Sequence, residues 1–213
     1  MTPGRPRSAA PRSFRASLGG ALLAGVIAAA HPAAAARLTD FTQEELRTLP
    51  STCLAQRFIN EELAAPVVPD AERERLSTKL GHSFIHYHHY CWALLWLARA
   101  EQPDGDKFNF HRAIDNLDYV IRNADPSFAL MPQVYLLKGD ILARTGKRDA
   151  ALIEYRNALR ADPTYTPAYL ALAQHYVDAG DPAAARAVLA EGLRHDPRAQ
   201  ALTQKQAELG AKP

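Results

Sequence analysis

The C-terminal half of the chain repeats with a period of 34 residues, and this feature constrains the fold more than any other. Residues one period apart are identical or similarly small at six position pairs: Tyr135 and Tyr169, Gly139 and Ala173, Gly146 and Gly180, Ala151 and Ala185, Ala158 and Gly192, and Pro163 and Pro197. A fixed period of this length is typical of stacked helical units, because one unit cannot bury its apolar face alone.

Each period is predicted to hold two helices, at 132–145 with 147–161 and at 166–179 with 182–195. Gly146 and Gly180 should end the first helix of each pair, because glycine adopts a left-handed backbone without steric cost. Gly139 and the alanines of the second helix are expected to be small because two helices cross closely there. Most of the chain after residue 37 shows helical periodicity, so the sequence predicts an all-α protein.

The repeated positions resemble the tetratricopeptide repeat family. The matching residues of the first repeat are Tyr135, Gly139, Ala151, Tyr155, Ala158 and Pro163. Those of the second repeat are Tyr169, Leu172, Ala173, Tyr176, Ala185, Leu189 and Pro197. The sequence departs from the family pattern at Lys138 for leucine, Leu142 for an aromatic residue and Gly192 for alanine.

The resemblance implies a right-handed α-solenoid of antiparallel helix pairs, here with extra N-terminal helices. It also implies a concave surface, lined by the first helix of each pair, that holds a peptide or a partner helix. The positions mapped to that surface are Gln133, Leu136, Asp140, Arg144, Leu170, Gln174, Val177 and Asp178. The alternative is that these side chains are only solvated or stack against neighbouring helices.

Residues 1–36 have the composition of a secretory signal peptide. Four arginines and no acidic residue precede an apolar run of about 13 residues, and Ala34 and Ala36 form an A-x-A ending. This run is shorter than the roughly 20 residues that span a bilayer. We therefore expect cleavage, no membrane span in the remaining chain and a periplasmic or secreted protein; an uncleaved N-terminal anchor is the alternative.

The leader also accounts for the basic excess of the chain. The full sequence has 25 basic and 23 acidic residues, a formal charge of +2. Without the four leader arginines the formal charge is −2, and no long run of like charges remains. The charge pattern therefore gives no indication of a nucleic-acid partner.

The sequence divides into a leader (1–36), an N-terminal helical section (37–80), a degenerate helix pair (81–124), two tetratricopeptide repeats (125–197) and a C-terminal capping helix with a tail (198–213). Thr42 and Glu45 form a capping-box pattern at the start of the N-terminal section. Asp70 is expected to cap the charged helix at 71–80.

A histidine-rich segment precedes the repeats. On an α-helix over 82–100, His82, His86 and His89 would share one face and could converge on zinc or copper, with His111 as a fourth ligand. No carboxylate lies on that face, and no H-E-x-x-H motif is present. Packing within the fold and recognition of a partner are the alternatives to a metal site.

The two cysteines, Cys53 and Cys91, lie on separate predicted helices of a chain expected to be exported. A disulfide between them would tie the N-terminal helices to the histidine-rich helix. The alternatives are two buried free thiols and, more remotely, a catalytic thiol.

The sequence contains no nucleophile-elbow, phosphate-loop or S-x-x-K motif, so no catalytic residue is predicted. The favoured prediction is a non-enzymatic scaffold without a cofactor that binds a protein or peptide of the cell envelope, in an envelope or secretion assembly. The second hypothesis is a periplasmic metal-binding protein that uses the histidine face.

Overall fold

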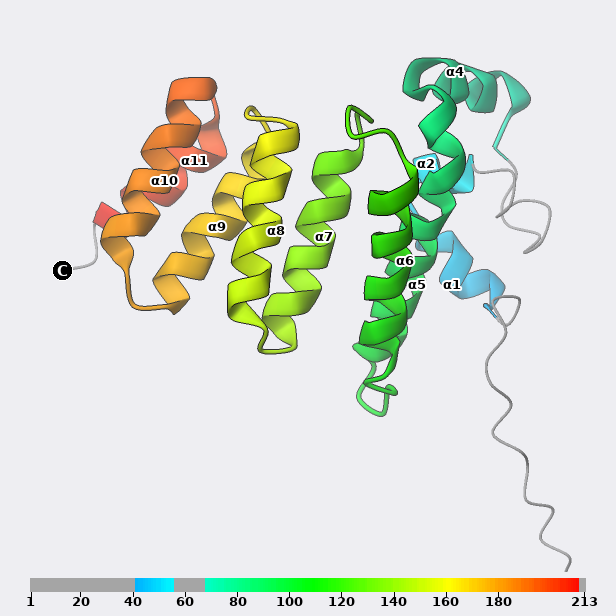
Figure 1. Ribbon diagram of the computed structural model, residues 1–213, viewed down its shortest axis with the longest axis horizontal. Coiled ribbons are helices and arrows are strands. Elements are labelled where there is room, and N and C mark those ends of the chain that lie inside the picture. The colour runs from blue at the N-terminus through cyan, green and yellow to red at the C-terminus, as the bar shows by residue number, and fades with distance from the viewer. Residues whose placement is uncertain (1–40, 56–67, 211–213) are drawn as a thin grey trace, which may run out of the picture. The chain divides into compact units, whose positions relative to one another are not determined.

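The computed structural model describes residues 41–55 and 68–210, and the predicted leader lies outside these ranges. All regular structure in the described ranges is helical, so the predicted all-α class is confirmed (Figure 1). The helices are α1 (Gln43–Arg47), α2 (Ser51–Leu54), α4 (Asp70–Leu80), the 3₁₀ helix η1 (His82–Tyr87), α5 (His88–Ala100), α6 (Asn109–Asn123), α7 (Met131–Arg144), α8 (Arg148–Ala161), α9 (Thr166–Asp178), α10 (Pro182–His195) and α11 (Gln200–Gly210).

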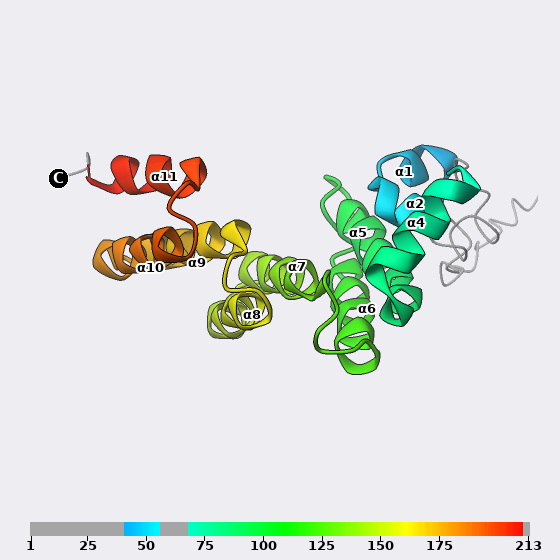
Figure 2. The ribbon, with the colours of Figure 1, turned by 90° about the horizontal axis from the view of Figure 1, so that it is seen from above.

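Helices α7 to α10 form the two predicted helix pairs. Successive helices run in opposite directions and lie side by side, α7 against α8 and α9 against α10 (Figure 1). The first helices also contact one another, α7 with α9, and α9 with α11. Figure 2 shows α8 beside α7 and α11 beside α9 and α10. This stacking is that of an α-solenoid, and α11 covers its last pair.

Glycines set one close helix contact and the two turns that the period predicts. A Cβ atom on Gly139 would lie 2.6 Å from Cε1 of Tyr155, so α7 and α8 cross at a distance that only glycine permits. Gly146 and Gly180 have φ values of 78° and 79°, in the left-handed region, and each follows the first helix of a pair. The predicted roles of these glycines are therefore confirmed.

Lys138 stands where the family has leucine, and the structure shows how the charge is accommodated. Its Nζ lies 2.7 Å from Oδ1 of Asp118 on α6 and 2.6 Å from Oε1 of Glu154 on α8. Burial alone would lower the pKa of Lys138, but the hydrogen bonds to the two carboxylates outweigh it, and the pKa is raised. An ion-pair triad thus joins three helices at a position the family fills with an apolar side chain.

The N-terminal helices are held by contacts between distant parts of the sequence. The predicted capping box is present, because Thr42 and Glu45 exchange hydrogen bonds at the start of α1. The other Glu45 contact is to Arg99 of α5, whose Nη2 donates to Oε2 at 2.9 Å. Hydrogen bonds from Arg99 lower the pKa of Glu45. The prediction for Asp70 is wrong: α4 begins at Asp70 itself, and its carboxylate pairs with Arg73 instead of capping the helix.

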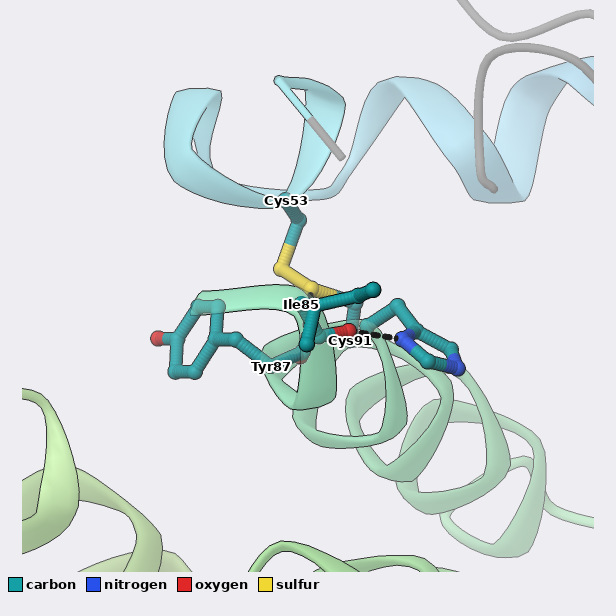
Figure 3. The surroundings of a disulfide bond; sticks show 5 residues. Cys53, Ile85, Tyr87 and Cys91 are labelled. Carbon is teal, nitrogen blue, oxygen red and sulfur yellow. Dashed lines mark hydrogen bonds between the residues drawn. A yellow bond between two sulfur atoms is a disulfide. The ribbon is translucent and has the colours of Figure 1, made fainter. Parts of the chain in front are cut away.

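The disulfide predicted between Cys53 and Cys91 is present in the structure. It joins α2 to α5, as Figure 3 shows, and both cysteines are fully buried. Their Cα atoms lie 5.5 Å apart, although 38 residues separate them in the sequence. A covalent bond therefore fastens the short N-terminal helices to the histidine-rich helix.

Aromatic rings and guanidinium groups alternate along one side of α5. Arg99 lies over the Phe41 ring at 4.2 Å and near Trp96 at 5.4 Å. Arg112 of α6 lies 4.8 Å from the Trp96 ring and 5.2 Å from the Phe108 ring. Such cation–π contacts stabilise the packing of α1 and α6 against α5.

Candidate partner-binding surface

Three of the residues predicted to bind a partner converge on one small cavity. Asp140 comes from α7, and Gln174 and Asp178 come from successive turns of α9. The cavity has a volume of about 170 Å³ and lies between α7, α8 and α9. Its other lining residues are Ala143, Arg148, Tyr155, Ala171 and His175.

Hydrogen bonds fix the polar groups around this cavity. The Tyr155 hydroxyl donates to Oδ1 of Asp140 at 3.0 Å, which ties α8 to α7. Gln174 donates through Nε2 to Oδ1 of Asp178 at 2.7 Å, one turn along α9. Arg148 donates to the backbone oxygen of Asp178 at 3.1 Å and so satisfies the C-terminal end of α9. The acceptors and donors are therefore held in place from three helices.

The Asp140 carboxylate is unfavourably placed for a charged group. Burial raises the pKa of Asp140, and the hydrogen bond from Tyr155 offsets only part of this rise. Burial also raises the pKa of Tyr155, and the negative charges of Asp140 and Asp178 raise this pKa further. The hydroxyl therefore stays protonated and remains a donor to Asp140.

Two further tyrosines lie within electrostatic reach of Asp140. Burial raises the pKa of Tyr90, on α5, to about 12, and the charges of Tyr165 and Asp140 contribute. Burial likewise raises the pKa of Tyr165, which precedes α9, with Asp140 again contributing. The charge of Asp140 thus raises the pKa of tyrosines on α5, on α8 and at the start of α9.

The remaining predicted binding residues do not line the cavity. Arg144 is exposed and pairs with Glu101, which follows α5. Gln133 is half-buried, and no residue in the described part of the chain donates a hydrogen bond to its buried Oε1. The apolar candidates pack partly against the core between helices: Leu136, Leu170 and Val177.

Sequence reasoning missed Tyr155 and Arg148 as members of this site. The repeat pattern indicates only a space-filling role for Tyr155, yet its ring covers Gly139 while its hydroxyl holds Asp140. A signal for this is present in the sequence, because Asp140 directly follows the glycine that the tyrosine covers. Arg148 gives no such signal, since its bond to Asp178 crosses 30 residues of sequence.

The predicted metal site is wrong, because the histidine-rich segment is not one α-helix. Residues 82–87 form a 3₁₀ helix, with three residues per turn, which moves the side chains off the expected common face. His82 is exposed and lines a different hollow, beside α4. Across 41–55 and 68–210, no three His, Cys, Asp or Glu side chains gather in an arrangement that would hold a metal ion.

His86 and His89 instead pack around Tyr119 of α6. The His89 ring stacks on Tyr119 with centroids 3.7 Å apart, and its Nδ1 lies 2.7 Å from Oδ1 of Asn116. The His86 ring centroid lies 5.8 Å from that of the same tyrosine. Burial lowers the pKa of His89 to about 4. These two imidazoles therefore have the packing role that was the alternative to metal binding.

Comparison with known proteins identifies the repeat region. Residues 142–209 match a family whose description is tetratricopeptide repeat, and the match runs from the end of α7 through α11. No curated protein matches the chain. Among solved structures, TTC0263, a thermophilic TPR protein of Thermus thermophilus, is similar, with a TM-score of 0.47 and 22% identity over 64% of this chain and 77% of that chain.

Residues 142–209 match the tetratricopeptide repeat family. The resemblance predicted from the 34-residue period is therefore confirmed. Helical repeats of this kind stack to present extended binding surfaces. The repeat region is a protein–protein interaction scaffold.

Proposed function

We propose that this protein is an exported, non-enzymatic scaffold that holds a protein of the cell envelope, within an envelope or secretion assembly. The partner lies on the first-helix face, which we define as the surface formed by α7 and α9. The observation that carries the proposal is the convergence of Asp140, Gln174 and Asp178 on one cavity at that face.

A contrast with other polar groups of the fold supports this assignment. Lys138 pairs with two carboxylates of neighbouring helices, and Glu45 pairs with Arg99. These charged groups therefore stabilise the fold. Gln174 and Asp178 are exposed and bond mainly to each other, on adjacent turns of one helix. Their positions add little to the stacking of the helices and leave them accessible to a partner.

Export is supported by the leader pattern of residues 1–36 and by the disulfide. A disulfide persists in an oxidising compartment such as the periplasm and is rare in the cytosol. In the described part of the chain, no helix is long and apolar enough to cross a membrane. N-terminal sequencing of the protein from a periplasmic fraction tests export: we expect a chain that starts at Arg37, and a full-length chain in the cytosol would contradict it.

Site-specific photocrosslinking tests the binding face. A photoreactive residue is placed at Gln174 in one variant and, as a matched control, at Arg160, an exposed position of α8 outside the cavity. We expect Gln174 to give a discrete crosslinked species in cells and Arg160 to give none. Equal products from both positions, or products from Arg160 alone, would contradict the proposal.

A further inference from the structure

We infer that the cavity between Asp140 and Asp178 takes a lysine or arginine side chain of the partner. This inference rests on the proposed function, because the cation is carried by the protein that binds the first-helix face. It adds the chemistry of recognition: one basic side chain, inserted between two carboxylates from neighbouring helices.

The size and walls of the cavity suit one side chain. Its volume is about 170 Å³. A cavity of about 150 Å³ is enough for one benzene molecule, so this one admits the end of a single side chain but no larger element. Ala143, Ala171 and the Tyr155 ring provide apolar surface, against which the methylene stem of lysine or arginine packs well.

Each of the two carboxylates at the cavity has one oxygen that accepts no hydrogen bond from the described residues. Tyr155 donates to one oxygen of Asp140, and Gln174 donates to one oxygen of Asp178. Within residues 41–55 and 68–210, no group donates to Oδ2 of either carboxylate. An ammonium or guanidinium group carries several donors and no acceptor, so it matches these free oxygens.

Both carboxylates stand where they cost stability in the free protein. Asp140 is substantially buried with only one donor, and burial disfavours its charged form. Asp178 is the last residue of α9, where the negative end of the helix dipole repels an anion. A bound cation offsets both costs, which gives a reason for these residues other than folding.

The one arginine that lines the cavity does not pair with either carboxylate. The Arg148 guanidinium is bonded to the backbone oxygen of Asp178, at the end of α9, and not to either carboxylate. An anionic ligand would meet two negative charges. A metal ion would lack ligands, since the described residues hold no suitable group of three. The organic cation of a protein side chain is the ligand that fits.

Nuclear magnetic resonance titration of the purified protein, in the form recovered from cells, tests the inference. The probes are N-acetyl-arginine amide and N-acetyl-lysine amide, with N-acetyl-citrulline amide as the neutral control. We expect saturable shifts of the Gln174 and Asp178 backbone amides with both cations and none with citrulline amide. Equal shifts with citrulline amide, or no saturable shift with either cation, would overturn the inference.

Three variants locate the bound cation. Asp140→Asn and Asp178→Asn should each weaken cation binding about tenfold, because each removes a charge-assisted hydrogen bond. Asp178 is exposed, so its substitution leaves the fold intact even if Asp140→Asn disturbs the bond to Tyr155. Asp149→Asn, an exposed aspartate of α8 outside the cavity, should bind as wild type does. An equal loss in Asp149→Asn would show unspecific attraction and overturn the inference.

Crosslinking separates failure of this inference from failure of the proposed function. If Gln174 gives no product in the wild-type background, the proposed binding face is wrong. If Gln174 gives the same yield with and without Asp178→Asn, the face binds a partner but the cavity does not recognise a cation. The inference predicts a product whose yield falls in the Asp178→Asn background.

Discussion

The N-terminal helices and the repeat pairs are both helical, but different contacts hold them together. In the repeats, the defining contacts join residues close in sequence, such as Asp140 and Tyr155, 15 positions apart. In the N-terminal part, a disulfide spans 38 positions, and the Glu45–Arg99 ion pair spans 54. The repeats are therefore specified by local contacts and stack side by side, whereas the N-terminal helices depend on contacts between residues far apart in sequence.

Removal of the disulfide should have the largest effect and should fall on one region. We expect Cys53→Ala with Cys91→Ala to lower the free energy of unfolding by about 4 kcal/mol, because a loop of this length is no longer closed in the unfolded chain. Thermal unfolding followed by circular dichroism measures the loss. Hydrogen exchange should rise in α1, α2 and α5 but not in α9 or α10. Equal increases in both regions would contradict the comparison.

Gly139→Ala tests the close helix crossing within the repeats. The new Cβ atom would lie 2.6 Å from the Tyr155 ring, so the helices must move apart, and we expect a loss of about 1–3 kcal/mol. Denaturant unfolding measures this. Gly210→Ala is the matched control, because a Cβ atom there meets no neighbour within 4 Å. Equal stability of the two variants would show that α7 and α8 do not cross as closely as described.

Lys138 links the two regions, because its ion pairs join α6 to α7 and α8. Lys138→Met should cost about 1–2 kcal/mol, since it leaves the Glu154 carboxylate without its cation in a largely buried position. Adding Glu154→Leu should recover most of the loss. A double variant no more stable than Lys138→Met would contradict the account of the triad.

The raised pKa of Lys138 fixes the pH range of this contribution. The folded protein binds the proton more tightly than the unfolded chain, whose lysine pKa is 10.5. The stabilisation is therefore fully present below that pH and is lost as the pH rises above it. The difference in melting temperature between wild type and Lys138→Met should shrink in that alkaline range.

His89 has its effect only in acid solution, at the contact between α5 and α6. Its pKa is about 4 in the folded protein against 6.5 for an ordinary histidine, so the unfolded chain binds the proton more tightly. Stability should therefore fall as the pH drops from 6.5 toward 4. His89→Gln, which keeps a partner for Asn116, should flatten this part of the melting-temperature profile. A profile unchanged by the substitution would contradict the packing role.

The period of 34 residues is enough to predict the helix pairs of the repeats and the glycines between them. It places Asp140, Gln174 and Asp178 on first helices, because position within a helix follows from spacing alone. It cannot predict Arg148 at the end of α9 or Asp118 beside Lys138, since those contacts depend on how separate helices stack. The sequence shows that Lys138 departs from the family pattern, but it does not show which two carboxylates pair with this lysine.

The histidine segment is predicted wrongly for a related reason. Spacings of three and four residues place His82, His86 and His89 on one face only if the helix is regular. Gly81, with a φ of 71°, interrupts the chain there, and Phe84 and Tyr87 are drawn into the core from a 3₁₀ helix. Packing of these aromatic residues decides the local geometry, which periodicity alone does not report.

Binding on the first-helix face is tested most directly by the affinity of the crosslinked partner for two matched variants. The dissociation constant of the purified partner is measured for wild type, Gln174→Ala and Arg160→Ala, which change exposed helix positions on the first-helix face and outside it. We predict that Gln174→Ala weakens binding about tenfold and that Arg160→Ala changes it by less than about twofold. Equal affinities for all three proteins, or a larger loss with Arg160→Ala, would contradict binding on the first-helix face.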